Sequence, residues 1–183
     1  MASKLRFFLR QNDKMGAFRI RMTTITCYTS LPTPIGELFI EGNDKAVTRI
    51  WFEGEDITPQ GRKHTNSVLA DARRQLKEYF EGKRADFDLP LEAQGTDFQK
   101  AVWKAMSRIR YGQTSTYGQL AKAVHRPVTA ARGVGQACGH NPLPVVVPCH
   151  RVLGKNGELT GYGGKVWRKE WLLAHEQTHH PAD

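Results

Sequence analysis

The strongest constraint on the fold is the stretch Val145-Val146-Val147-Pro148-Cys149-His150-Arg151, near the C-terminal end of the chain. Three successive β-branched residues favour extended backbone and predict a short buried strand. Because proline withholds its N–H from a sheet, this strand would end at Pro148. Cys149 would then stand at the end of a rigid element, where a fold can hold a reactive thiol in place.

Cys149 has two interpretations. A free cysteine is most often a small buried hydrophobe, which is the purely structural one. The neighbours His150 and Arg151, with Asn141 upstream, favour a reactive thiol, because positive charge lowers a thiol pKa. A Cys–His hydrolase is less favoured, since adjacent side chains of an extended chain point to opposite faces. His150 would reach the sulfur only if the backbone turned or a water molecule bridged the two groups.

Composition excludes several classes of protein. With 183 residues, 39% of them apolar and 25% charged, the chain predicts a soluble globular protein of one domain or two small ones. No apolar run approaches the roughly 18 residues needed to span a bilayer. Three cysteines without disulfide spacing indicate a reducing cytoplasm. No C-x-x-C or H-x-x-x-H pattern surrounds Cys149, so we expect no metal site.

The positive charge is unevenly distributed. The net charge is +9, and residues 96–183 hold 12 Lys and Arg against 5 Asp and Glu. Residues 23–95 instead hold 9 basic against 12 acidic residues. A basic C-terminal half beside a mildly acidic module is typical of a protein in which one module binds a polyanion. Basic surface alone does not establish nucleic acid as that polyanion.

The N-terminal half predicts a small sheet with one helix. Residues 24–52 alternate between apolar and polar residues with turns between, which indicates an antiparallel meander. Residues 66–81 carry apolar residues at helical spacing and end before Gly82. We therefore assign residues 1–22 to a flexible basic extension, 23–90 to a sheet-and-helix domain, 96–176 to a second domain and 177–183 to a tail.

The basic extension has no assigned role. It lacks the long apolar core and the small-residue cleavage site of a signal peptide. Met15 or Met22 could equally be the biological start, and a mitochondrial targeting role has little support.

The C-terminal half predicts a helical module. Thr96 with Gln99 and Thr116 with Gln119 fit capping boxes that open two helices. A third, small-residue-rich helix runs from Thr129 to Cys138. The last two helices suggest a helix-turn-helix, although an ordinary helical hairpin fits the pattern about as well. Small residues favour the DNA-binding interpretation, because they let a backbone approach a groove closely, with Arg132 as the side chain long enough to enter it.

The remaining segments complete an α/β (α+β) fold. A hairpin or loop is expected near Asn156-Gly157, a glycine loop with one aromatic over residues 160–164, and a final helix over residues 166–176. The expected architecture is thus a small antiparallel sheet plus helix, followed by a mostly helical, winged-helix-like DNA-binding and catalytic domain.

Several motifs in fixed order carry a family resemblance. Asn141-Pro142 precedes Pro148-Cys149-His150-Arg151-Val152, and Gly161-Tyr162-Gly163-Gly164 and the segment 169–176 (KEWLLAHE) follow. Together they resemble the O6-alkylguanine-DNA alkyltransferase family over about residues 96–176. The N-terminal module agrees only in its general strand and helix pattern.

The resemblance implies direct-reversal repair of DNA: one alkyl group moves from guanine O6, or less efficiently from thymine O4, to a protein cysteine. It makes Cys149 the acceptor, His150 a water-bridged base and Glu176 the carboxylate that orients it. It implies that Asn141 ties the recognition-helix turn to the active-site loop, and that Tyr117 helps rotate the nucleotide and donates a proton toward guanine N3. It assigns DNA contacts to Arg132, Thr129, Ala130, Ala131 and Gly135, and the base pocket to Tyr162, Val152, Gly163 and Gly164.

The same resemblance implies a single-turnover enzyme that works without a cofactor, on double-stranded DNA containing O6-alkylguanine, as a monomer. Two alternatives remain. One is an alkyltransferase-like protein that binds lesions without repairing them, against which Cys149 argues directly. The other is a helix-turn-helix regulator with an incidental cysteine. For Cys138 we favour packing over reactivity.

Overall fold

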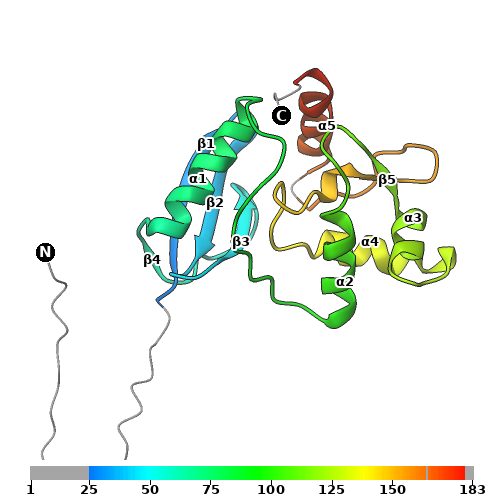
Figure 1. The fold of residues 1–183 in the computed structure, drawn as a ribbon, viewed down its shortest axis with the longest axis horizontal. Helices are drawn as coiled ribbons and strands as arrows, with labels where there is room; N and C mark the ends of the chain where they lie inside the picture. Colours follow the sequence, from blue (N-terminus) through cyan, green and yellow to red (C-terminus); the bar gives the residue numbers. More distant parts are fainter. Residues whose placement is uncertain (1–24, 164, 180–183) are drawn as a thin grey trace, which may run out of the picture.

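The computed structural model describes residues 25–163 and 165–179, and the expectations for residues 1–24, Gly164 and residues 180–183 lie outside this range. Two bodies lie side by side: a sheet covered by one helix, and a group of helices with loops (Figure 1). This confirms the predicted order of a small N-terminal sheet followed by a mostly helical module.

The sheet contains four strands in the order β3-β2-β1-β4. Strands β1 (Cys27–Thr33), β2 (Gly36–Gly42) and β3 (Val47–Phe52) pair antiparallel, so the predicted meander is confirmed. Strand β4 (Arg62–Lys63), which pairs parallel with β1, was not predicted. Its two residues are polar and exposed, and so short a segment has no hydrophobic alternation to detect.

Helix α1 (Ser67–Phe80) covers one face of this sheet (Figure 1). The Asn66 side chain caps it by accepting a hydrogen bond from the Leu69 N–H, 2.9 Å away. Apolar residues three or four apart face the sheet, as predicted for residues 66–81, and the fully buried ones are Leu69, Ala72, Leu76 and Tyr79.

The helical body begins with α2 (Asp97–Met106) and α3 (Tyr117–Ala123), and both predicted capping boxes are present. The third predicted helix starts later than expected. Residues Val128–Ala130 form a 3₁₀ turn, and α4 runs only over Ala131–Gly139. Helices α2, α3 and α4 pack on one another, and Trp103 Nε1 donates to Ala137 O at 2.8 Å, which joins α2 to α4.

Two short strands and a last helix complete this body. Strand β5 (Ser115–Thr116) pairs parallel with β6 (Val152–Leu153). The Asn156-Gly157 segment is a loop closed by the bond from Gly154 N to Glu158 O, 2.9 Å, and not a strand hairpin. Helix α5 (Val166–Thr178) confirms the predicted final helix. Among the described helices, none has the length and apolar character needed to cross a membrane.

The prediction of a strand over Val145–Val147 is wrong. These residues form a turn, in which Val145 has a φ of +73° and Val147 N donates to Leu143 O at 2.8 Å. Prolines at positions 142, 144 and 148 remove the N–H groups that a sheet would need. Val145 and Val147 are buried, so the apolar run predicted their burial but not their conformation. Cys149 consequently begins a 3₁₀ helix, Cys149–Arg151, and does not follow a strand.

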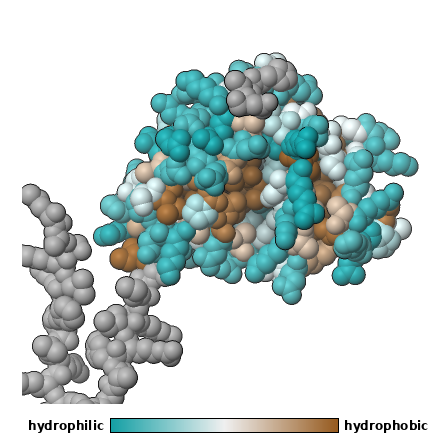
Figure 2. All heavy atoms as spheres, in the orientation of Figure 1, coloured by the Kyte–Doolittle hydropathy of each residue, from teal (hydrophilic) through white to brown (hydrophobic). Residues whose placement is uncertain are grey.

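Hydrogen bonds join the two bodies. Ile50 N of β3 donates to Pro142 O at 2.8 Å, and Arg168 Nε of α5 donates to Ile35 O at 2.9 Å. Apolar side chains of both bodies form one continuous core. On the face shown in Figure 2, hydrophilic side chains surround apolar surface near the middle of the molecule. The sheet is therefore fixed against the loop that carries Asn141 and Cys149.

Candidate active site

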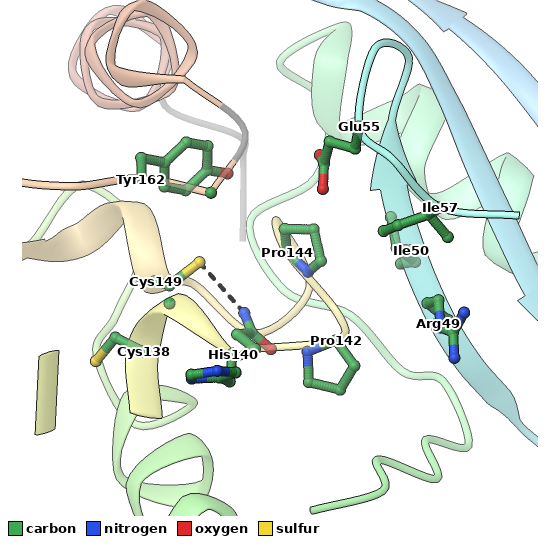
Figure 3. A pocket seen from close by; sticks show the side chains of 13 residues that line it. Arg49, Ile50, Glu55, Ile57, Cys138, His140, Pro142, Pro144, Cys149 and Tyr162 are labelled. Atoms are coloured by element: carbon green, nitrogen blue, oxygen red, sulfur yellow. Dashed lines mark hydrogen bonds between the residues drawn. The ribbon is translucent and has the colours of Figure 1, made fainter. Parts of the chain in front are cut away.

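The Cys149 thiol lies in the tightly folded segment between α4 and β6. Its side chain is buried, with 9% of the residue exposed. Asn141 Nδ2 lies 3.2 Å from Cys149 Sγ and also donates to Val147 O at 2.8 Å, while Asn141 Oδ1 accepts from Leu143 N. One amide side chain thus holds the turn together and touches the sulfur, as Figure 3 shows.

The thiol is not activated in the way that its neighbours suggested. Burial raises the pKa of Cys149, while the Asn141 hydrogen bond and the Lys169 charge act in the opposite direction. The side chains of His150 and Arg151 both hydrogen-bond to Glu176, and neither bonds to the sulfur. The expectation that His150 and Arg151 lower the thiol pKa through positive charge is therefore wrong. The resting group is a thiol, which needs a base before it can attack.

The Glu176 carboxylate is the centre of a buried hydrogen-bond network. Its Oε1 accepts from Tyr79 Oη at 2.7 Å, His150 Nε2 at 2.8 Å and Arg151 Nη2 at 2.9 Å. Its Oε2 accepts from Arg151 Nε at 2.9 Å and Gly112 N at 3.0 Å. Burial opposes ionisation, but the hydrogen bond from His150 and the hydrogen bonds and charge of Arg151 outweigh it and lower the pKa of Glu176. Glu176 is a carboxylate at neutral pH.

This network fixes the tautomer of His150. A carboxylate only accepts hydrogen bonds, so the proton of the neutral imidazole must be on Nε2. His150 Nδ1 then carries the lone pair, and it is buried without a hydrogen-bond partner among the described residues. Burial is the main cause that lowers the pKa of His150, so the ring is neutral at pH 7. The structure thus presents an oriented base with a free acceptor nitrogen.

Lys169 is a site residue to which sequence analysis gave no role. It is fully buried, and its Nζ donates to Val152 O at 2.6 Å and to Thr160 O at 3.1 Å. Burial lowers the pKa of Lys169. The ammonium joins β6 to the loop that carries Tyr162 and acts on the Cys149 sulfur through its charge. The only signal in the sequence was its place in the 169–176 motif, because burial of a lysine cannot be seen in a pattern.

A cavity of about 220 Å³ opens beside the thiol (Figure 3). From the helical body it is lined by Cys149, Asn141, Tyr162 and Gly163 together with the end of α4. The sheet body contributes a second wall, which sequence analysis missed: Arg49, Ile50, Glu55 and Ile57. Val152 is buried but does not line this cavity. The site is therefore built by both halves of the chain.

Cys138 also lines this cavity, at the C-terminal end of α4. The predicted packing role fits its burial, with 6% of the residue exposed. Burial is the largest cause that raises the pKa of Cys138 to about 12, so this group is a neutral thiol. Within the described residues no cluster of three or more His, Cys, Asp or Glu could hold a metal ion.

The predicted DNA-contacting residues form a separate surface. Arg132 and Thr129 are exposed, and Ala130, Ala131 and Gly135 are partly exposed. Tyr117 opens α3, and its hydroxyl lies 3.4 Å from Thr160 O. A surface groove beside it is lined by residues of α3, the turn and the Asn156 loop, including Lys122, Val128, Ala131 and Lys155. Arg132 lines neither this groove nor the thiol cavity.

Comparison with known proteins identifies both halves of the chain. Residues 97–178 match the profile "6-O-methylguanine DNA methyltransferase, DNA binding domain", and residues 26–93 match "6-O-methylguanine DNA methyltransferase, ribonuclease-like domain". The constitutive methylated-DNA--protein-cysteine methyltransferase of Bacillus subtilis is 47% identical, over 80% of this chain and 92% of its own length. The corresponding protein of Mycolicibacterium paratuberculosis is 43% identical, over 85% of this chain and 94% of its own length.

Solved structures of similar proteins have the same fold. The O6-methylguanine methyltransferase of Mycobacterium tuberculosis superposes with a TM-score of 0.79 at 40% identity, over 87% of this chain and 97% of that chain. The same enzyme crystallised with DNA gives a TM-score of 0.79 at 41% identity, over 85% of this chain and 96% of that one. Matches over both halves, at this identity and coverage, show that this chain belongs to the 6-O-methylguanine DNA methyltransferase family.

Proposed function

We propose that this protein repairs DNA by direct reversal, moving one alkyl group from guanine O6 in double-stranded DNA to the sulfur of Cys149. Thymine O4 would be a poorer donor. The observation that carries the proposal is the position of the Cys149 thiol: it lines a cavity, bonds to Asn141 and follows a turn that places His150 on Glu176. Family membership and the DNA-bound relative support the same activity.

Proton removal is the first step. A buried thiol with a raised pKa is a weak nucleophile, so its proton must leave as the sulfur attacks. The proton acceptor is His150 Nδ1, reached through one water molecule, because His150 Nε2 is already bonded to Glu176. The imidazolium formed is stabilised by the Glu176 carboxylate, and the Asn141 amide and the Lys169 charge stabilise the developing thiolate.

The transfer itself is a substitution at carbon. The sulfur electron pair forms a C–S bond to the alkyl carbon as the C–O6 bond breaks and its electrons pass to the purine. The purine anion takes a proton, which we assign to the Tyr117 hydroxyl acting at N3. The product is a thioether, which has no easy leaving group. Each protein molecule therefore reacts once, and no cofactor is needed.

The alkylated base must leave the DNA stack to reach this cavity. Extrusion of a nucleotide costs a few kcal/mol, which an inserted side chain and pocket contacts offset. Arg132 is exposed on the recognition helix α4. We assign its side chain to the position in the DNA stack that the extruded base leaves. The small residues Ala130, Ala131 and Gly135 let α4 approach a groove, and Tyr162, Gly163 and Gly164 would close on the base.

We further propose that residues 96–176 carry DNA binding and chemistry, that residues 23–90 support them, and that the protein works as a cytoplasmic monomer. The three buried cysteines are unpaired, which supports a reducing compartment. A lesion-binding protein without transfer activity is disfavoured by the thiol in the cavity, and a sequence-specific regulator by the match over both halves of the chain.

Stoichiometric transfer tests this function. A duplex with a radiolabelled methyl group on one guanine O6 is incubated with excess protein, and label in the protein fraction is counted. The proposal predicts that label moves to protein until one group per molecule is bound, and that unlabelled methylated duplex competes while unmethylated duplex does not. A lesion-binding protein would retain the duplex with its label on the DNA.

A further inference from the structure

The wall that the sheet body adds to the thiol cavity suggests how alkyl groups are selected. Arg49 and Ile50 come from the middle of β3, and Glu55 and Ile57 from the segment after it. In Figure 3 these four residues lie across the cavity from Cys149, with Pro142 and Pro144 between. An alkyl chain that extends past the sulfur in this direction would meet the sheet body.

This wall is held rigidly. Ile50 N is bonded to Pro142 O, directly after Asn141. Glu55 Oε1 accepts from Phe52 N at 3.0 Å, which fixes the start of the segment that follows β3. The guanidinium of Arg168 lies 4.6 Å from the Phe52 ring centre and anchors α5 to the same strand end. A wall fixed at these points selects alkyl groups by size, because it cannot move aside for a longer substituent.

The wall is also polar. Tyr162 Oη is buried and has no hydrogen-bond partner among the described residues. Its hydroxyl end points toward the side of the cavity where Glu55 lies (Figure 3). Arg49 and Glu55 add two charged side chains to the lining. An apolar chain placed here would leave the Tyr162 hydroxyl unpaired, whereas a chain ending in a hydroxyl would bond to it.

We infer that the part of the cavity bounded by Arg49, Glu55, Ile57 and the Tyr162 hydroxyl is a subsite for alkyl tails longer than methyl, and that it prefers tails ending in a hydrogen-bonding group. The inference rests on the proposed function, since the tail arrives attached to the carbon that bonds to Cys149. The bonds formed and broken are unchanged. Ile57 sets the length of tail accepted, and Arg49 with the Tyr162 hydroxyl sets its polarity.

The test compares single-turnover rates on three duplexes, containing O6-methylguanine, O6-propylguanine and O6-(2-hydroxyethyl)guanine. Propyl and hydroxyethyl are close in size, so their ratio isolates polarity. The unsubstituted protein should favour hydroxyethyl over propyl by about fivefold, the value of one hydrogen bond. Ile57→Trp should lower the rates of both larger groups relative to the methyl rate by about tenfold or more. Arg49→Met should reduce the ratio of hydroxyethyl to propyl rates.

The neighbouring exposed position gives a matched control, since Thr58→Trp adds the same bulk outside the cavity lining. Methyl transfer by each variant reports that it is folded. Equal slowing of all three duplexes by Ile57→Trp, or equal rates for propyl and hydroxyethyl in the unsubstituted protein, would overturn the inference while methyl transfer stands. Absence of methyl transfer from the unsubstituted protein would instead overturn the proposed function, and this inference with it.

Discussion

His150 Nε2 lies 2.8 Å from Glu176 Oε1, although the two residues are 26 positions apart in the sequence. Helix α5 brings the carboxylate to the imidazole, and Arg151 and Tyr79 hold the carboxylate in place. This one contact leaves Nδ1 as the free basic atom of the ring. The proposed proton transfer from Cys149 depends on it.

Replacement of the carboxylate should therefore slow transfer. Glu176→Gln places an amide against the Nε2 proton and removes the charge that stabilises the imidazolium. We expect the single-turnover rate to fall by about a hundredfold, the size of a typical general-base effect. Tyr79→Phe removes a different hydrogen bond to the same Oε1 and leaves His150 paired. It should cost about 1 kcal/mol of unfolding free energy and keep most of the rate. Equal rates in both variants would refute the role of Glu176.

The reaction should fail in acid. The pKa of His150 is lowered from 6.5 by burial, so the ring stays neutral at pH 6.5 and becomes protonated only as the pH falls further. A protonated ring cannot accept the thiol proton. The transfer rate of the protein–DNA complex should hold through pH 6.5 and decline below it, which rapid-quench measurements across pH would follow. An acid limb centred above pH 6.5 would contradict the buried neutral imidazole.

Loss of the buried lysine should affect both folding and rate. Lys169→Met leaves the carbonyl oxygens of Val152 and Thr160 without this donor, and we expect the unfolding free energy in urea to fall by about 2 kcal/mol. The positive charge beside Cys149 is lost too, so transfer should slow and shift toward higher pH. Lys77→Met, on an exposed position of α1, is the control and should change neither quantity. An unchanged pH profile would leave Lys169 a purely structural residue.

DNA binding should depend on the exposed arginine of α4. Arg132→Ala removes one cation from the proposed groove-facing helix without touching the core. We expect weaker binding to duplex DNA, a salt dependence of binding shallower by about one counterion, and an unchanged melting temperature. Lys45→Ala removes a charge from the exposed turn before β3 and should leave binding unchanged. Equal effects of both variants would indicate nonspecific attraction in place of a defined surface.

Much of the fold could be read from local patterns. The meander, α1, the two capping boxes and α5 depend on residues close in sequence, and their prediction is confirmed. The turn that contains Val145 was harder to predict. Its three β-branched residues indicate a strand, but Val145 has a positive φ that valine disfavours. The three prolines around it prevent a strand.

The site was predicted in part, for a related reason. The family motifs named Cys149, His150, Asn141 and Glu176, which the structure brings together. The direction of the Cys149 pKa shift was predicted wrongly, because burial raises this pKa and the side chains of His150 and Arg151 bond to Glu176. Arg49 and Ile57 were missed because they approach the thiol only through the packing of the two bodies.

The central claim is tested most directly by locating the transferred group. The protein is incubated with an O6-methylguanine duplex, digested, and sequenced by tandem mass spectrometry, beside Cys149→Ala and Cys138→Ala. The account predicts a single added methyl group on Cys149, also present in Cys138→Ala and absent from Cys149→Ala. A methyl group on Cys138, or an unmodified protein after the duplex has been bound, would contradict it.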